Sequence, residues 1–349
     1  MIRVMLLLVA VLNTAPAAIA EDAVIAYSPP SGLLIVARGD AARIDVFNLQ
    51  SKAPLWSADG PASPRDIAID TADPRAAVLD PLRNEVALVS LGRRSVRIVR
   101  VAETPIAARF AGGSLFVLSR DGRRLQKIDE DGSITVSVGT SPDPAFLEVS
   151  GNRLYVYSRA SGSVVEYEIP TLRQLRTATA DRFASAFVVD DRTGYLVYPR
   201  SGRMQTISLA GMNSDEPMSV AAVPTDLAPA MPGGVLTPGT LVIADPASKR
   251  LWHIERAESA VSAFSRGFLR GFLGLGIARA PGRESPPGID RVWPVGSSEI
   301  AYDSASRTLY RISRDGAVVL AADAGPRSFA VAAGRLVLWK NGQVLFVGL

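Results

Sequence analysis

The sequence contains no cysteine, and His253 is its only histidine. The lack of cysteine excludes disulfides, thiolate metal sites, a lipid-anchored lipoprotein and the attachment motif of c-type haem. One histidine cannot build a multi-histidine copper or zinc site, and no Gly-x-Ser-x-Gly motif accompanies it for Ser-His-Asp catalysis. His253 stands in Leu251-Trp-His-Ile-Glu255, which favours a strand position over a ligand role. We predict no cofactor, and Ca²⁺ held by carboxylates and carbonyls is the metal that the composition still allows.

The sequence also lacks a large excess of charge of one sign and has few long apolar runs. The formal net charge of the 349 residues is +4, which is too small and too dispersed to indicate a nucleic-acid partner. Outside the N-terminus, no apolar run approaches the about 20 residues that a membrane-spanning helix needs. We therefore predict neither nucleic-acid binding nor a transmembrane span.

The N-terminus has the three parts of a secretory signal peptide. Arg3 provides a positive charge, Val4 to Leu12 form an apolar run of nine residues, and Ala18-Ile19-Ala20 precedes Glu21. An N-terminal membrane anchor is the alternative, but nine apolar residues are too few to span a bilayer. We predict that residues 1–20 are a signal peptide, that 21–349 form the mature chain, and that the protein is periplasmic or secreted.

Short strand-like segments recur in groups of four, separated by Gly, Pro, Asp and Ser. One group consists of Ala145-Phe-Leu-Glu-Val-Ser, Arg153-Leu-Tyr-Val-Tyr-Ser, Ser163-Val-Val-Glu-Tyr-Glu and Gln174-Leu-Arg-Thr-Ala-Thr. Segments of five or six residues with alternating or fully apolar character between turn residues indicate β-strands. Asp131-Gly132 is typical of a hairpin turn, and the acidic residues around it lack the spacing of a Ca²⁺ loop.

The spacing of these groups favours one fold. Four strands in about 40 residues are typical of a β-propeller blade, because neighbouring blades bury each other's faces. A sandwich or barrel does not require this spacing. We predict an all-β chain with one propeller domain of seven or eight blades; the count favours eight, the last with three strands. The first strands begin near Val24, Asp66, Ile106, Ala145, Ser185, Asp226, Ile289 and Ser328, at intervals of 39 to 42 residues except for one of 63.

Several segments resemble the YVTN-type repeat propellers of exported and periplasmic proteins. Leu154-Tyr-Val-Tyr-Ser and Leu115-Phe-Val-Leu-Ser stand at the second-strand position of that pattern, and Leu125-Gln-Lys-Ile-Asp is similar to its third strand. Val138-Gly-Thr-Ser-Pro142 is similar to its linker. No repeat contains the full four-residue signature. The resemblance covers nearly all of the mature chain and implies a propeller, whereas propellers as a class host many unrelated functions.

Charged residues recur at the starts of the predicted inner strands. Inner strands line the central channel of a propeller, so these side chains are expected to converge at its mouth. There they would bind a small polar ligand, hold Ca²⁺ or support acid–base chemistry. The alternative is that they form turns, caps and ion pairs between blades, since Asp is a routine turn residue. The candidate ligand-binding residues are Arg65, Asp66, Asp226, Asp290, Arg291 and Arg327.

The long interval contains an apolar insertion, predicted at about 257–287. Its aromatic residues follow a helical spacing, although its glycines weaken a free helix by up to about 1 kcal/mol each. It would either dock on its own propeller or offer an apolar surface to a protein partner or to a membrane surface. The candidate partner-binding residues are Phe264, Phe268 and Phe272, with Arg266 and Arg270 at the rim.

These features predict an exported, non-catalytic propeller that binds a protein partner or a ligand through a loop face, the channel mouth or the insertion. The alternative is a periplasmic propeller enzyme, which the resemblance would make a lactonase-like hydrolase or a protein associated with quinone-cofactor oxidoreductases. No catalytic motif matches positions in this chain. We therefore favour the binding module and assign no catalytic residues.

Overall fold

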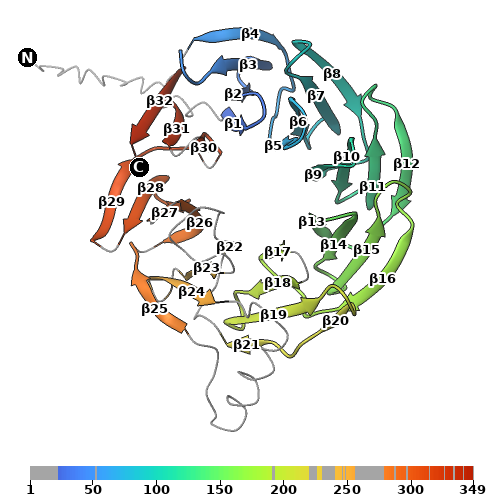
Figure 1. The fold of residues 1–349 in the computed structure, drawn as a ribbon, viewed down its shortest axis with the longest axis vertical. Coiled ribbons are helices and arrows are strands. Elements are labelled where there is room, and N and C mark those ends of the chain that lie inside the picture. The colour runs from blue at the N-terminus through green and yellow to red at the C-terminus, as the bar shows by residue number, and fades with distance from the viewer. Residues whose placement is uncertain are drawn as a thin grey trace, which may run out of the picture.

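The computed structural model describes residues 23–349 except 52, 191–192, 220–225, 230–239, 246, 248, 256–278, 287, 296–297, 314, 326, 333–334, 341 and 349. The described residues form eight antiparallel sheets, each a meander in chain order, and the sheets are arranged in a ring (Figure 1). The protein is therefore an all-β propeller of eight blades, as predicted. Within the described ranges no helix has the length and hydropathy that a membrane crossing requires.

The blades follow the chain, and each runs from the centre of the ring outward (Figure 1). The inner strands begin within one residue of the predicted positions. They are β1 (Ala23–Ser28), β5 (Asp66–Ile69), β9 (Pro105–Ala111), β13 (Pro144–Ser150), β17 (Ala186–Asp190), β22 (Asp226–Pro229), β26 (Ile289–Val295) and β30 (Phe329–Ala332). The second strands are β2 (Leu33–Arg38), β6 (Arg75–Asp80), β10 (Ser114–Ser119), β14 (Arg153–Ser158), β18 (Thr193–Tyr198), β23 (Thr240–Asp245), β27 (Ser298–Asp303) and β31 (Arg335–Lys340).

The outer half of each blade is less uniform. The third strands are β3 (Arg43–Asn48), β7 (Glu85–Ser90), β11 (Arg124–Ile128), β15 (Ser163–Glu168), β19 (Arg203–Ser208), β24 (Arg250–Glu255), β28 (Thr308–Ser313) and β32 (Gln343–Gly348). The outer strands are β4 (Pro54–Asp59), β8 (Ser95–Arg100), β12 (Ile134–Gly139), β16 (Gln174–Thr179), β25 (Arg279–Glu284) and β29 (Gly316–Ala321). In the fifth blade two short strands, β20 (Asn213–Ser214) and β21 (Met218–Ser219), both pair with β19. The described residues of the eighth blade form three strands, as predicted.

The place of a strand in its blade explains its residue pattern. Second strands are covered on both sides by neighbouring blades, so β14 is a nearly continuous apolar run whose residues after Arg153 are all buried. Outer strands are covered less, and β16 is mostly exposed and carries Gln174, Arg176 and Thr177. The alternation of fully apolar and mixed segments in the sequence therefore reflects depth within the blade.

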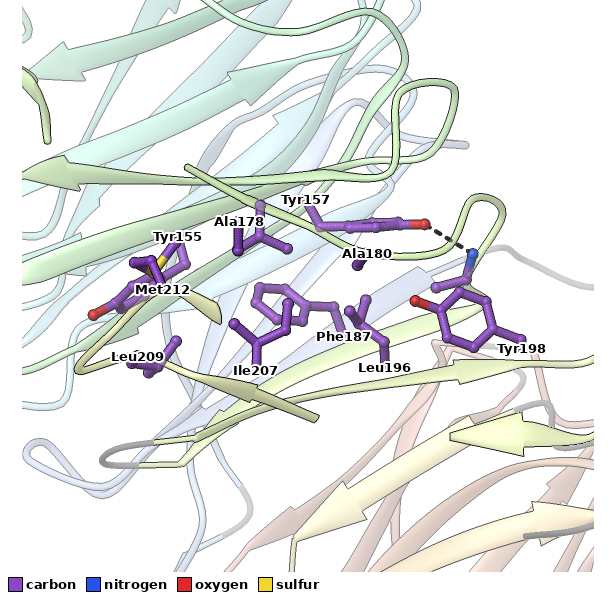
Figure 2. Close-up of a cluster of buried hydrophobic side chains, with 12 residues drawn as sticks. Tyr155, Tyr157, Ala178, Ala180, Phe187, Leu196, Tyr198, Ile207, Leu209 and Met212 are labelled. Carbon is purple, nitrogen blue, oxygen red and sulfur yellow. Dashed lines mark hydrogen bonds between the residues drawn. The ribbon is translucent and has the colours of Figure 1, made fainter. Parts of the chain in front are cut away.

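The hydrophobic core is divided among the interfaces between neighbouring blades. Figure 2 shows one such cluster, in which Tyr155 and Tyr157 of β14 lie opposite Phe187 of β17 and Ile207 of β19. The rings of Tyr157 and Phe187 are 6.2 Å apart. Because each described cluster is shared by two blades, no blade could bury its faces alone, and the ring is one domain.

The first and last blades join by side-chain packing, and the described residues exchange no strand between them. The ring of the buried Trp339 in β31 lies 6.0 Å from the ring of Phe47 in β3, measured between centroids. The guanidinium carbon of Arg38 lies 5.5 Å from the centroid of the Trp339 ring. The backbone N–H of Ile25 donates to the carbonyl oxygen of Arg327 at 2.9 Å. These contacts close the ring.

The sixth blade corrects one predicted boundary. Residues at the end of the expected 257–287 insertion form β25, which pairs with β24 in an antiparallel ladder from Arg250↔Glu284 to Ile254↔Arg279. The sequence does not predict this strand, because Pro281 and Gly282 have a low preference for strands. The extra length therefore lies between Glu255 and Arg279. Residues 1–20 and the predicted contact residues Phe264, Arg266, Phe268, Arg270 and Phe272 lie outside the described residues.

Candidate functional site

The number of strands per blade decides which residues share an end of the ring. In a four-stranded antiparallel meander, the outer strand ends on the face where the inner strand began. The linkers between blades and the turns between second and third strands therefore lie on one face, which we call the linker face. Arg65 directly precedes β5, Arg327 precedes β30 by two residues, and Arg291 is the third residue of β26. The topology gathers these three arginines at the linker face.

A cavity of about 460 Å³ lies at this face among the first three and last two blades. We call it the linker-face cavity. Positive charge dominates its lining: among the described lining residues, the guanidinium groups outnumber the single carboxylate by three. The charged residues are Arg65, Asp66, Arg120, Arg291 and Arg327. Four of the six candidate ligand-binding residues therefore meet at one cavity.

An ion pair between distant parts of the chain crosses the cavity. Nη1 of Arg327 lies 2.9 Å from Oδ1 of Asp66, and both side chains are 39% exposed. The same nitrogen donates a hydrogen bond to the backbone carbonyl of Arg65. Arg327 belongs to the eighth blade and Asp66 to the second, so the pair spans the inner strand of the first blade. It fixes the guanidinium at the edge of the cavity.

The positive charges repel one another. Burial lowers the pKa of Arg327, the Asp66 carboxylate opposes that shift, and the charges of Arg291 and Arg65 lower the pKa further. Guanidinium groups nevertheless remain protonated, because their ordinary pKa lies far above neutral pH. The cavity therefore holds permanent positive charge that the carboxylates of Asp66 and Asp121, paired with Arg327 and Arg120, offset only in part.

A second cavity of about 460 Å³ adjoins the first and has Val24, Asp66, Arg291 and Arg327 in common with it. We call it the inner cavity. Its remaining described lining residues are apolar: Ile25, Ile67, Trp293, Phe329, Ala330 and Val331. The indole of Trp293 stands edge-on to Phe329, with ring centroids 4.9 Å apart. The arginines thus lie where a charged mouth meets an apolar wall.

The two remaining candidate carboxylates are placed differently. Asp290 lies at a bulge in β26 and accepts hydrogen bonds from the hydroxyl and the backbone N–H of Ser304, the latter at 3.3 Å. It is not among the residues lining either cavity. It therefore fits the alternative role of a turn residue. Asp226 is the first residue of β22, opposite Ala244, and the position of its side chain lies outside what is described.

Among the charged and aromatic residues that line the two cavities, three were not predicted from the sequence. Arg120 follows β10 in a turn on the linker face, where its guanidinium pairs with Asp121 at 3.2 Å. Trp293 and Phe329 are inner-strand residues. The spacing of Arg291 and Trp293, two apart on one strand, was the available signal, because such residues point to the same side.

The lining is suited to oxyanions. Guanidinium groups bind carboxylates and phosphates through paired N–H donors. Asp66, the one carboxylate among the described lining residues, is engaged with Arg327. Among the residues that the structure places, no three His, Asp or Glu side chains are grouped as metal ligands. His253 lies in β24 between β23 and β25, in the strand position that was predicted. The expectation that no cofactor is bound stays a prediction.

Fold and site define an eight-bladed β-propeller with an arginine-lined mouth. No known family model and no curated protein matches the sequence, so membership of the YVTN-type family stays a prediction. Solved propellers are similar in fold. BamB from Moraxella catarrhalis is 12% identical over 93% of both chains, with a TM-score of 0.64. The computationally designed Ika8 protein is 12% identical over 95% of this chain and 98% of its own, with a TM-score of 0.66. Hydrazine synthase from Kuenenia stuttgartiensis is 16% identical over 84% and 96%, with a TM-score of 0.60. At these identities the likeness shows the fold alone.

Proposed function

We propose that the protein is an exported, non-catalytic propeller that binds its ligand or protein partner at the linker-face cavity. The observation that carries this proposal is the convergence of Arg65, Arg291 and Arg327 from three blades around one cavity. Arg291 lies in β26, and Arg65 and Arg327 lie in linkers within two residues of β5 and β30, so the inner strands hold all three near fixed positions. The loops around them can vary without affecting the blades. Such a mouth is suited to recognition.

Permanent charge favours binding over catalysis at this cavity. An arginine does not exchange protons near neutral pH, so it cannot act as a general acid or base there. Asp66 is held in an ion pair with Arg327. The enzyme alternative, lactonase-like or associated with quinone cofactors, would need a proton acceptor or a cofactor site in addition to these groups.

Export is the second part of the proposal. It rests on the signal-like N-terminus and on the resemblance of the strands to exported YVTN-type propellers. N-terminal sequencing of protein recovered from the periplasm or medium should begin at Glu21. A mature chain that still begins at Met1 would overturn the compartment.

The insertion remains a proposed second contact surface for a protein or for the surface of a membrane. An extra segment of more than about 15 residues in a compact domain often has a function, and the sequence between Glu255 and Arg279 is rich in Phe and Leu. Replacement of residues 260–276 by a short Gly/Ser linker would separate its role from that of the cavity.

The test compares capture of binding partners by purified variants in periplasmic extract with a cross-linker. Arg65→Glu combined with Arg291→Glu should abolish the capture that the wild type shows, because it reverses the charge of the mouth. Arg93→Glu is the matched control: Arg93 is a 75% exposed arginine in the turn between β7 and β8, on the opposite face. Unchanged capture by the double variant, or equal loss in the control, would reject the linker-face cavity as the binding site. Loss only in the insertion variant would assign binding to the insertion.

A further inference from the structure

The two adjoining cavities differ in the chemistry of their lining residues, and this difference indicates which kind of ligand would fit both. The linker-face cavity has an excess of three positive charges among its described lining residues. The inner cavity, apart from the charged residues it has in common with the first, is lined by aliphatic and aromatic side chains. A molecule that occupied both would present an anionic group to the mouth and an apolar group to the channel wall.

The apolar wall is built from three inner strands. Trp293 comes from β26, Ile25 from β1, and Phe329 and Val331 from β30. Trp293 is half-buried and forms an edge-to-face pair with the buried Phe329. A ring held in this way is a rigid surface on which a flat or aliphatic group can pack at small entropic cost. Burial of apolar ligand area on this wall would favour binding, because it removes that area from water.

A carboxylate is the anion that Arg327 already binds. Asp66 meets Arg327 at 2.9 Å, so the geometry of the mouth accommodates a carboxylate oxygen. Arg65 is exposed at the cavity, and its guanidinium has no hydrogen-bond acceptor among the described residues. It is therefore free to bind a carboxylate supplied by a ligand.

We propose that the joined cavities bind a carboxylate attached to an apolar group, with the carboxylate between Arg65 and Arg327 and the apolar group against Trp293 and Phe329. This inference rests on the proposed function, because it names the ligand class of the same site. Burial is the main cause of the lowered pKa of Arg327, and the charges of Arg291 and Arg65 lower it further; an added anion would relieve their repulsion, which is consistent with the proposed site. A small organic acid and the C-terminus of an apolar peptide share this chemistry.

Isothermal titration calorimetry of the mature protein with defined probes tests the ligand class. The probes are 3-phenylpropionate, its uncharged amide, propionate, phenyl phosphate, and acetyl-Ala-Ala-Phe as the free acid and as the amide. We expect 3-phenylpropionate to bind at least about tenfold more tightly than its amide, which lacks the charge, and than propionate, which lacks the apolar group. Raising NaCl from 50 to 500 mM should weaken its binding, because salt screens exposed charges.

Variants separate this site from general damage to the fold. Arg65→Ala should weaken 3-phenylpropionate binding about three- to tenfold, whereas Arg93→Ala on the opposite face should leave it unchanged. Asp66→Asn should tighten binding about three- to tenfold, because it removes the negative charge that competes for Arg327. Damage to the fold would weaken binding in both site variants, so the opposite sign of the two effects is diagnostic.

The outcomes divide clearly. If the free-acid peptide binds much more tightly than 3-phenylpropionate, a peptide C-terminus is the source; the reverse assigns a small acid. Equal binding of the acid and its amide, tighter binding of phenyl phosphate, or weaker binding in Asp66→Asn would overturn the carboxylate assignment.

If no probe binds while Arg65→Glu with Arg291→Glu still abolishes partner capture, the carboxylate inference fails and the proposed function stands. If the probes behave as expected while capture is unaffected, the carboxylate site stands and the partner binds elsewhere.

Discussion

The hydroxyl of Tyr157 ties the fourth blade to the linker that leads into the fifth. It donates to the carbonyl oxygen of Asp181 at 2.9 Å and accepts from the backbone N–H of Ala184 at 3.1 Å; Figure 2 shows the second bond as a dashed line. Tyr157 is fully buried, and the N–H of Ala184 is buried with it. The tyrosine ring also packs in the cluster between the two blades.

Tyr157→Phe should therefore lower the free energy of unfolding by about 2 kcal/mol. The substitution leaves the buried N–H of Ala184 without an acceptor, which costs about 1–3 kcal/mol. The carbonyl of Asp181 adds little, because Asp181 is exposed and water can replace the lost bond. The ring stays in place, so the apolar packing contributes almost nothing to the change.

Guanidinium denaturation followed by circular dichroism measures the effect. Tyr310→Phe is the matched control: Tyr310 lies half-buried in β28, and its hydroxyl has no hydrogen-bond partner among the described residues. The control should change the free energy of unfolding by less than about 0.5 kcal/mol. A loss below about 0.5 kcal/mol in Tyr157→Phe, or a loss equal to that of the control, would show that the hydroxyl does not hold the linker.

Three further predictions concern the blade interfaces and the channel wall. Burial raises the pKa of Glu148 above 4.5, against the attraction of Arg109 at 2.9 Å. Because the pKa of Glu148 is raised in the folded state, the folded protein binds the proton more tightly than the unfolded chain does. The free energy of unfolding of the wild type should therefore fall, relative to that of Glu148→Gln, as the pH rises from about 4.5 through the raised pKa. Denaturation at pH 4 to 8 checks this, and a growing advantage of wild type with pH would contradict it. Trp339→Ala should lower the free energy of unfolding by about 3–5 kcal/mol in the same assay, because it removes the buried ring that packs between the last and first blades. A loss below about 1 kcal/mol would show that other contacts hold these two blades together. Arg176→Ala should cost about 2–3 kcal/mol, because it removes the 2.5 Å partner of the buried Glu166; the loss should shrink when Glu166→Gln is already present, and simple additivity would show that the pair is not coupled.

Much of the fold was predictable because its signals are local. Strand starts at Asp66, Asp226 and Ile289 follow from short apolar segments and turn residues, which act over a few positions. The end of the insertion was missed for the same reason. Residues 279–284 form a strand because they pair with β24, and this pairing outweighs their low intrinsic preference for strand structure.

The sequence by itself predicted repeats of about 40 residues, mostly of four strands, with eight favoured over seven. It also predicted that charged residues beside the inner-strand starts, among them Arg65, Arg291 and Arg327, lie at one end, since antiparallel meanders of regular length return to one face. Only the tertiary structure decided which side chains meet there. Arg327 reaches Asp66 because ring closure brings the eighth blade beside the first and second, and Asp290 turns to Ser304 because of a bulge. Periodicity along a chain specifies strands and their order, whereas the direction of a side chain and its partners depend on packing between residues that are remote in sequence.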